Sequence, residues 1–320
     1  MNEYWLSIVI PSYNVENFLA DCIASIEPSE HNDIEVILVD DGSTDSTPVL
    51  CDDFSSLYEN VNVIHRENGG AAAARNMGCF HASGKWVWFV DSDDLISPYS
   101  FDLLKPICES TDANALHIQF LKFKGTAEPV WPIPSGRIWQ ITADDYLTGL
   151  YSGYHQHYMY SFLLRTENLR KNANGFPFRE DFSLYDDVVA VEEMMRGISL
   201  IEMCPWTLYG YRQVASSMSH KRNNDASNSG LRAVLNLQEH AVPKDIADDK
   251  VCMEIGLLFT AYRIAERGHE GDMLRARIRK EIELRVNRVG VMKLSGRYAI
   301  RYLLLETGLM EKIIDWRDFD

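Results

Sequence analysis

The chain has 320 residues, of which 46% are hydrophobic, and it carries a formal net charge of −16 at pH 7. This length and apolar content indicate one large or two smaller globular domains and exclude a chain that is disordered throughout. The acidic balance argues against nucleic acid as a partner, because phosphate backbones are bound through lysine and arginine.

Over the first hundred residues, short apolar runs alternate with segments whose apolar residues recur at helical spacing. The apolar runs cover 6–10, 34–39, 61–64 and 86–90, and the helical segments cover 15–26, 47–58 and 71–82. Short continuous apolar runs fit strands that are buried on both faces, as in parallel sheets. The order β-α-β-α-β-α-β therefore predicts an α/β fold with a Rossmann-like, mostly parallel sheet flanked by helices.

Beyond residue 98 the alternation is less regular. We expect helices at 101–108, 161–173 and 188–195, a strand at 115–123 and two short strands within 200–211. The polar segment 216–230 has few apolar residues and predicts a loop. Helical spacing then dominates up to residue 316, which indicates a helical module in the C-terminal part of the chain.

Polar residues follow three of the predicted strands, at the point where each strand ends. They are Ser12-Tyr13-Asn14, Asp40-Asp41 and Asp91-Ser92-Asp93-Asp94. Because ligands in open α/β sheets lie beyond the carboxyl ends of the strands, these side chains predict a nucleotide pocket. In it, Tyr13 could stack, Asp41 could bind base or ribose, and Arg75 could meet phosphate or base. The glycine-rich phosphate loops of dinucleotide-binding and ATP-hydrolysing proteins are absent from the sequence, which argues against both activities.

Asp91, Asp93 and Asp94 place three carboxylates within four residues. Such a cluster needs positive charge nearby, and the hard cations Mg²⁺ and Mn²⁺ prefer oxygen ligands and often bind together with substrate phosphates. The alternative is a helix N-cap followed by solvated acids. The triplet alone therefore leaves both a metal site and a structural role open.

Two further features concern the cellular compartment. Six cysteines are scattered without a Cys-x-x-Cys pair, a pattern typical of reduced cytosolic thiols and not of a zinc site or a disulfide framework. No apolar run approaches the roughly 18–20 residues that span a bilayer. We therefore expect a cytoplasmic protein.

Four motifs occur in one order along the chain: Ser-Ile-Val-Ile-Pro-Ser-Tyr-Asn, Ile-Leu-Val-Asp-Asp-Gly-Ser-Thr-Asp, Glu-Asn-Gly-Gly-Ala-Ala-Ala-Ala-Arg-Asn and Phe-Val-Asp-Ser-Asp-Asp. Together they resemble the family 2 inverting glycosyltransferases of the GT-A fold, closely over residues 5–100 and more thinly to about residue 215. The resemblance implies a nucleotide-sugar donor, most often a UDP-sugar, with Mn²⁺ or Mg²⁺ on its diphosphate. It also implies a glycan or lipid-linked sugar acceptor and a role in bacterial surface polysaccharide synthesis.

The family pattern also implies roles for individual residues. Those implied to bind the nucleoside and ribose of the donor are Pro11, Tyr13, Asn14, Asp41, Asn68, Arg75, Asp91 and Ser92. The metal is implied to bind Asp93 or Asp94. The corresponding division is a donor-binding half at 1–110, an acceptor-facing half at 111–225 and a helical module at 226–320.

An inverting transfer needs a carboxylate that deprotonates the acceptor hydroxyl as it attacks the anomeric carbon. Family members place this base in a Glu-Asp pair after an aromatic-rich stretch and before a helix, and the chain offers two candidates. Glu180-Asp181 matches the residue types, whereas Asp186-Asp187 matches the position, with aspartate in place of the usual glutamate. We expect Asp187 to be the base, with Asp181 as the alternative.

The segment 216–230 contains His220, which could reach the diphosphate or the metal from a loop that closes over the donor. The alternative is a solvated loop histidine. We expect this segment to act as a lid that excludes water from the reaction.

Residues 271–301 carry nine basic and three acidic side chains, a local balance of +6 in an acidic chain. Leu274, Ile278, Ile282 and Val289 recur at helical spacing in the same stretch. A basic amphipathic helix can bind an anionic inner-membrane surface, where a lipid-linked acceptor would lie. The alternative is that the apolar stripe packs on the rest of the protein and the charges are solvated.

Two other functions fit parts of the pattern. Nucleotidyltransferases that make nucleotide-sugars share parallel sheets and acidic metal sites, but they carry a glycine-rich, basic phosphate loop where this chain has Pro11-Ser12-Tyr13-Asn14. The second alternative is an inactive scaffold protein that binds sugar-nucleotides. The intact acids Asp91, Asp93 and Asp187 argue against it.

Overall fold

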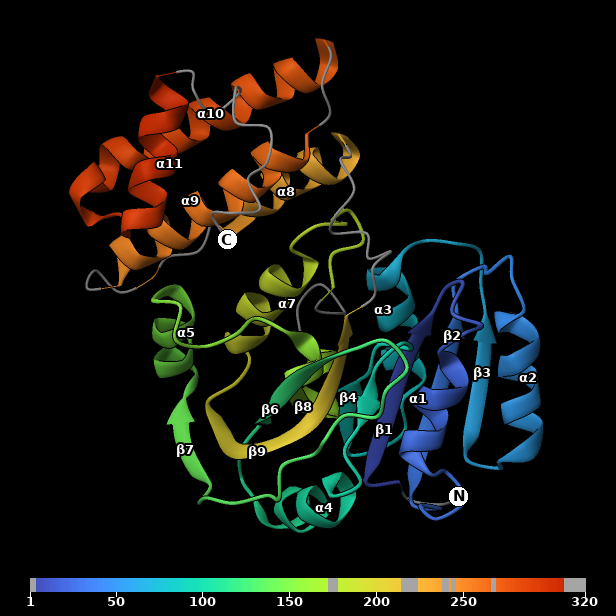
Figure 1. Ribbon diagram of the computed structural model, residues 1–320. Coiled ribbons are helices and arrows are strands. Elements are labelled where there is room, and N and C mark those ends of the chain that lie inside the picture. Colours follow the sequence, from blue (N-terminus) through green and yellow to red (C-terminus); the bar gives the residue numbers. More distant parts are fainter. Residues whose placement is uncertain are drawn as a thin grey trace. The chain divides into compact units, whose positions relative to one another are not determined.

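The computed structural model describes residues 4–171, 178–213, 224–237, 242, 246–265 and 269–307 (Figure 1). The chain divides into two compact units. The first comprises Met1–Tyr146, His157–Glu180 and Asp186–Ser217, and the second comprises Leu147–Gln156, Asp181–Tyr185 and Met218–Asp320. Both the proposed donor-binding half and most of the acceptor-facing half therefore belong to the first unit, which we call the sheet unit. The second is the helical unit.

Within the described residues, nine strands form one sheet in the order β3-β2-β1-β4-β8-β6-β9-β5, with β7 paired to β9. The strands are β1 (Leu6–Ser12), β2 (Ile34–Asp40), β3 (Val61–His65), β4 (Trp86–Phe89), β5 (Leu95–Ile96), β6 (Ala115–Lys124), β7 (Trp139–Thr142), β8 (Phe162–Arg165) and β9 (Leu200–Gln213). The pairs β1–β2, β2–β3 and β1–β4 are parallel, which confirms the arrangement predicted for the first hundred residues. β8 is antiparallel to β4 and β6, so the complete sheet is mixed.

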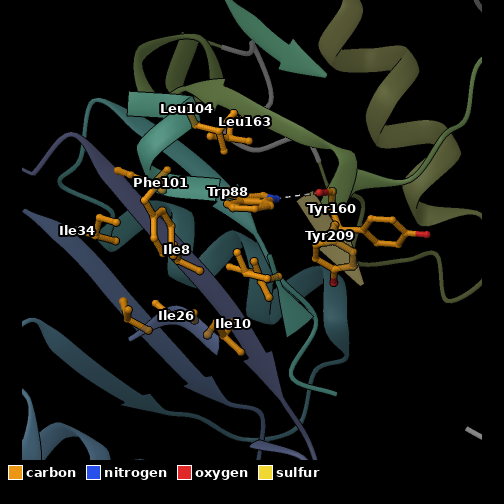
Figure 2. Packing of buried hydrophobic residues seen from close by; sticks show 14 of the residues in the cluster. Ile8, Ile10, Ile26, Ile34, Trp88, Phe101, Leu104, Tyr160, Leu163 and Tyr209 are labelled. Atoms are coloured by element: carbon orange, nitrogen blue, oxygen red, sulfur yellow. Dashed lines mark hydrogen bonds between the residues drawn. The ribbon is translucent and has the colours of Figure 1, made fainter. Parts of the chain in front are cut away.

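Helices cover both faces of the parallel half. They are α1 (Leu19–Ile26), α2 (Thr47–Leu57), α3 (Ala71–His81) and α4 (Ser100–Ser110). On one face, Ile8 and Ile10 of β1 belong to the same core cluster as Leu19 and Ile26 of α1 (Figure 2). On the other face, a Cβ atom added to Gly78 of α3 would lie 2.3 Å from a methyl carbon of Val9. The glycine thus allows α3 to lie directly against the sheet.

Two expectations for the later part of the sheet unit are wrong. Residues 162–165, expected to be helical, form β8, because this apolar run is inserted between β4 and β6; helix α6 (Thr166–Lys171) follows it. Residues 200–213 form one strand instead of two. The register between β6 and β9 shifts around Pro205, which accommodates the proline without ending the strand. Helix α7 (Asp186–Met195) confirms the helix expected at 188–195.

The helical unit contains α8 (Asn224–Leu237), α9 (Ala247–Ile264), α10 (His269–Val289) and α11 (Gly296–Glu306), while α5 (Ala143–Tyr151) spans its boundary with the sheet unit. Residues 224–230, expected in a loop, begin α8. Their polarity is misleading because small polar side chains face the interior: Ser227 Oγ donates to Ala261 O (2.8 Å), and Ser229 Oγ accepts from Ser183 N (2.7 Å). The remainder of the predicted lid lies outside the described residues.

The apolar stripe of α10 is buried inside the helical unit. Leu274, Ile278, Ile282 and Val289 belong to one core cluster with residues of α8 and α9. The stripe therefore packs within the protein and is not a free membrane-facing surface. None of the described helices is long and apolar enough to cross a bilayer.

The six cysteines are free thiols. Five of them are buried, and Cys252 in α9 is partly buried. Burial raises the pKa of Cys51, Cys79 and Cys204 to about 12. These thiols therefore remain protonated and unreactive at neutral pH in the folded protein.

Candidate active site

The parallel strands bring their polar termini to one edge of the sheet. Ser12 at the end of β1 lies opposite Asp40 at the end of β2, and Asp41 N donates to Ser12 O (2.9 Å). On the other side of β1, Val90 N donates to Val9 O (3.0 Å), so the acid loop (residues 91–94) starts beside the same strand. The predicted pocket residues thus extend from neighbouring strand ends.

Arg75 gathers three carboxylates around one guanidinium group. Its Nη2 donates to Asp91 (2.9 Å), and its Nη1 donates to Asp186 (3.1 Å) and Asp187 (3.2 Å). Arg75 lies in α3 and is 8% exposed, with its guanidinium carbon 5.3 Å from the centre of the Phe178 ring. One cation facing three acids leaves an excess of negative charge at this point.

Asp187 has the properties of a base that works near neutral pH. It lies in the first turn of α7, and its side chain is 23% exposed. Burial raises its pKa, the Arg75 guanidinium lowers it, and the charges of Asp186 and Asp91 raise it again, which brings the pKa to about 7. General-base catalysis is most efficient when the pKa of the base lies near the working pH.

The other candidate pair is directed elsewhere. Glu180 Oε1 accepts a hydrogen bond from the Asn76 side chain (3.2 Å). Asp181 belongs to the helical unit, where its backbone oxygen accepts a hydrogen bond from Arg232 (2.6 Å). The structure thus brings Asp186-Asp187 to Arg75 and Asp91, and it gives Glu180-Asp181 different partners.

Asp41 organises the turn that precedes α3. Its carboxylate accepts hydrogen bonds from Arg66 Nη1 (2.7 Å), Gly69 N (3.0 Å) and Gly70 N (2.7 Å), and the residue is 3% exposed. These bonds fix the Gly-Gly turn and thereby the start of the helix that carries Arg75. A nucleoside that contacts Asp41 would meet a carboxylate already held in place.

Gly42, which follows Asp41, and Asn68, which precedes the Gly-Gly turn, form one wall of the predicted pocket and are closely packed. Gly42 adopts a positive φ of 72°, and a Cβ atom there would lie 2.8 Å from the backbone nitrogen of Asn68. Only glycine fits both the conformation and the space. The Asn68 side chain is exposed on this wall.

The residues after β1 form an open rim. Pro11 lies in β1, the Tyr13 side chain is 49% exposed, and Asn14 has a positive φ of 53°. The Asn14 side chain accepts a hydrogen bond from Thr44 N (2.8 Å), which ties the loop after β1 to the loop after β2. The exposed Tyr13 ring is available for stacking.

The two acids predicted to bind metal differ in their surroundings. Asp94 is fully buried, and its carboxylate accepts hydrogen bonds from Tyr209 Oη (2.6 Å) and Arg212 N (2.6 Å). Asp93 makes no ion pair with any described residue, and burial with the nearby charge of Asp91 raises its pKa to about 6. Ser92, which lies between Asp91 and Asp93 in the acid loop, is also buried. Asp94 is thus engaged within the fold, whereas the Asp93 carboxylate makes no ion pair, and the charge of Arg212 only partly offsets that of Asp91.

A divalent cation fits this donor set only with help from the substrate. Within the described part of the chain, no three or more His, Cys, Asp or Glu side chains form a group that could hold a metal ion. Mg²⁺ and similar hard cations are commonly bound through one or two carboxylates together with substrate phosphates. The Asp93 carboxylate, which makes no ion pair with any described residue, and Asp91 two residues away match that mode.

One predicted site residue cannot be placed, and three residues that hold the site in position were not predicted. His220 lies outside the described residues. Conversely, no motif in the sequence marks Arg66, Tyr209 and Arg212, which hold Asp41 and the acid loop. The only available signal was the position of Arg66 and Arg212 at the ends of apolar runs, where a charged side chain can reach the sheet edge.

Residues 7–166, half of the chain, match the family model described as Glycosyl transferase family 2. The chain is 40% identical over 112 residues to glycosyltransferase GlyG of Streptococcus pneumoniae, covering 35% of this chain and 37% of that protein. It is 30% identical over 218 residues to the uncharacterized glycosyltransferase EpsJ of Bacillus subtilis, covering 67% and 62%. It is 40% identical over 115 residues to the minor teichoic acid biosynthesis protein GgaA of Bacillus subtilis, covering 34% and 26%. Each match spans less than two thirds of the relative.

Among solved structures, the fold is similar to S. aureus TarS 1-349 in complex with UDP-GlcNAc, with a TM-score of 0.69, 18% identity and coverage of 96% of this chain and 88% of that one. It is also similar to the mannosyltransferase PcManGT from Pyrobaculum calidifontis in complex with GDP-Man and Mn²⁺, with a TM-score of 0.55, 16% identity and coverage of 94% and 86%. These likenesses confirm the expected GT-A type of fold. With the family model covering half its length, the chain belongs to glycosyl transferase family 2.

Proposed function

We propose that this protein is an inverting glycosyltransferase that moves a sugar from a nucleotide-sugar, of the UDP class by family resemblance, to an acceptor hydroxyl. One observation carries the proposal. Arg75 joins Asp187, a carboxylate with a pKa of about 7, to Asp91 of the acid loop at the carboxyl edge of the sheet. This contact supports a proton acceptor that lies beside the proposed donor site.

In this proposal the rim and wall of the pocket bind the donor. Tyr13 stacks on the base, Asp41 and Asn68 contact the nucleoside, and Pro11 and Asn14 shape the rim. Asp91 and Ser92 lie at the ribose, and Arg75 contacts the donor from α3. The TarS structure that shares this fold is described as a complex with UDP-GlcNAc, which supports a nucleotide-sugar donor of this kind.

Asp187 removes the proton from the acceptor hydroxyl as that oxygen attacks the anomeric carbon. The new bond forms on the face of the sugar opposite the departing nucleoside diphosphate, so the configuration inverts. Arg75 orients Asp187 and limits the rise of its pKa, so that a large fraction of the base is ionised at neutral pH. Asp181, which belongs to the helical unit, is the less favoured base.

For the metal we propose Mn²⁺ or Mg²⁺ bound at Asp93. When bound, the cation would neutralise charge on the leaving diphosphate. Asp94 is the less favoured ligand because its carboxylate already accepts hydrogen bonds from Tyr209 and Arg212. The fold neighbour PcManGT, described as a complex with GDP-Man and Mn²⁺, supports a divalent cation.

The acceptor is proposed to be a glycan or a lipid-linked sugar in the synthesis of a surface polysaccharide or teichoic acid, in line with the relative GgaA. Tyr158 and Tyr211 are half-buried, and both rings stack with Tyr160, which in turn stacks on Tyr209 beside the acid loop. Their rings can stack on the apolar face of an acceptor sugar.

Release of UDP from a panel of UDP-sugars in the presence of Mn²⁺ tests this function. We expect turnover with at least one donor, and loss of turnover in Asp93→Ala and Asp187→Ala. Wild-type rates in both variants would overturn the mechanism. Two rival functions give different results: a nucleotidyltransferase would release pyrophosphate from UTP and a sugar phosphate, and an inactive scaffold would bind UDP-sugars without any turnover.

We also propose that the helical unit binds an anionic membrane surface, through the outward side of α10 instead of its buried stripe. Met273, Arg277, Lys280, Leu284 and Arg288 are exposed and recur at helical spacing. The three basic side chains make no ion pair with any described residue. Cations of this kind each contribute about 1 kcal/mol near an anionic bilayer.

Liposome flotation tests this surface. We expect salt-sensitive binding to vesicles that contain phosphatidylglycerol, little binding to pure phosphatidylcholine, and loss of binding in the double variant Arg277→Glu/Lys280→Glu. Equal flotation of the wild type and the double variant would remove α10 from the proposal.

A further inference from the structure

We propose that Asp94, Tyr209 and Arg212 form a clamp that fixes the acid loop so that the Asp93 carboxylate is presented to the metal. The three residues would act as positioning residues and not as ligands. This inference rests on the proposed function, because it assumes that Asp93 meets a divalent cation together with the nucleotide.

Tyr209 holds the loop at both ends. Its hydroxyl donates to Asp94 Oδ2 (2.6 Å) and accepts a hydrogen bond from Asp91 N (3.1 Å). The side chain is fully buried in β9, with its ring stacked 4.3 Å from that of Tyr160 (Figure 2). One rigid hydroxyl thus ties the first residue of the loop to the last, and the span between them contains Asp93.

Arg212 holds the loop from three residues further along β9. Its backbone N donates to Asp94 Oδ1 (2.6 Å), and its Nε donates to the backbone oxygen of Asp93 (2.6 Å). The same guanidinium donates to Gly125 O (2.7 Å) and to Asp21 Oδ2 (3.2 Å). Arg212 therefore holds Asp93 by its main chain, and its charge acts on the Asp93 carboxylate without a direct hydrogen bond or ion pair to that side chain.

The strands explain why the clamp is rigid. β5 follows the acid loop directly and pairs with β9, with Leu95 opposite Gly210 and Ile96 opposite Tyr209. The loop is therefore bounded by β4 on one side and by β5 on the other, and β9 supplies both clamp residues that are not in the loop. A buried carboxylate with two donors is costly to rearrange, because any displacement leaves unpaired polar groups in the interior.

A purely structural role predicts loss of stability without a specific effect on the metal, so the test measures metal binding itself. The wild type, Tyr209→Phe, Asp94→Asn and the double variant are titrated with Mn²⁺ in the presence of UDP, and free Mn²⁺ is measured by electron paramagnetic resonance. Tyr160→Phe is the matched control, because the Tyr160 ring belongs to the same tyrosine stack and the Tyr160 hydroxyl makes no described hydrogen bond to the acid loop. Circular dichroism and the melting temperature report on folding.

We expect Tyr209→Phe to weaken Mn²⁺ binding by about tenfold to a hundredfold, the range found for residues that orient metal ligands. Asp94→Asn should weaken binding to a similar extent and the double variant no further, because both changes break the same contact. Tyr160→Phe should retain wild-type affinity. If Tyr209→Phe does not fold, Asp94→Asn against Asp93→Asn gives the same comparison.

The outcomes separate the two levels of the proposal. Complete loss of Mn²⁺ binding in Asp94→Asn, equal to that in Asp93→Asn, would make Asp94 a ligand and overturn the clamp. Unchanged affinity in folded Tyr209→Phe would also overturn it, while the proposed glycosyltransferase function would stand. If the wild type itself does not bind Mn²⁺ with UDP, the metal part of the proposed function fails and the clamp fails with it.

Discussion

Each of the two units contains a buried arginine that binds several carboxylates, but the charge balance differs. In the helical unit, Arg285 pairs with Glu254 (2.8 Å) and Glu281 (2.7 Å); the Arg285 and Glu254 side chains are each 3% exposed, and that of Glu281 is 25% exposed. In the sheet unit, Arg75 pairs with three acids whose side chains are 21% to 31% exposed. The second arrangement is more acidic and more open to solvent.

We interpret the Arg285 cluster as structural and the Arg75 cluster as a site where a carboxylate can gain and lose a proton. The Arg285–Glu254 ion pair links α10 to α9 and is nearly closed to water, so it holds the two helices together. The Arg75 cluster has three acids around one cation, and burial together with the charges of Asp186 and Asp91 raises the pKa of Asp187 to about 7. Strongly shifted acids at an accessible edge are typical of functional sites.

The largest effect is expected from the base itself. Asp187→Asn should lower kcat by about 10²- to 10⁴-fold, the usual contribution of a general base, because asparagine cannot accept the proton. Asp181→Asn is the matched control and should remain within a few-fold of the wild type. UDP release under saturating donor measures both; the reverse ranking would make Asp181 the base.

The second prediction compares the two arginines. Arg285→Met should lower the free energy of unfolding by about 3–5 kcal/mol, because it removes the cation that forms an ion pair with the buried Glu254 carboxylate. Arg75→Met should cost less stability, since its acids are partly solvated, but it should abolish most of the turnover. Urea denaturation and UDP release measure the pair, and an equal stability loss would show that the two clusters do the same work.

The pH dependence of turnover tests the shifted pKa. Because Asp187 must be ionised to accept a proton, activity should fall tenfold per pH unit below its pKa of about 7 and level off above it. Arg75→Lys, which weakens the interaction that lowers this pKa, should move the acidic limb to higher pH. A limb near pH 4 in the wild type would contradict the burial of Asp187 described here.

The smallest effect, on stability, is expected at His65, a partly solvent-exposed residue that also pairs with two acids. His65 contacts Asp40 (2.9 Å) and Asp52 (3.1 Å), and hydrogen bonds to these acids raise its pKa. A raised histidine pKa stabilises the fold below the unfolded value of about 6.5, and this stabilisation is lost as the pH rises through the folded pKa. Its size should be less than about 1 kcal/mol. Urea unfolding of the wild type and His65→Gln at pH 5.5 and 8.5 measures it; a larger difference at pH 8.5 would reverse the sign.

The parallel half of the fold is predictable because its signals are local. Continuous apolar runs such as Trp86 to Val90 can be buried only in a two-sided sheet, and the polar residues after them mark the site edge. The same reasoning fails for β8 and for residues 224–230. In both segments, contacts with distant parts of the chain determine the secondary structure. The apolar run of β8 pairs with two strands, and serines of α8 face the interior because they form hydrogen bonds there.

The site itself is only partly predictable for a similar reason. The sequence indicates the acid loop, but nothing in it shows that Tyr209 and Arg212, more than a hundred residues away, form hydrogen bonds with the Asp94 carboxylate and leave that of Asp93 without an ion pair. The convergence of Asp187 on Arg75 also depends on long-range packing. Spacing patterns report secondary structure, whereas charge balance at a site depends on which distant elements meet.

The rate at which a buried thiol is alkylated can report on local opening at the site. Cys22 Sγ lies 3.8 Å from the backbone oxygen of Asp91 and is fully buried, while Cys252 is the only one of the six that is partly accessible. An alkylating reagent should therefore label Cys252 first and reach Cys22 only when the structure around the acid loop opens. Following the Cys22 modification rate by mass spectrometry would report how firmly nucleotide and cation close this region, without any engineered label.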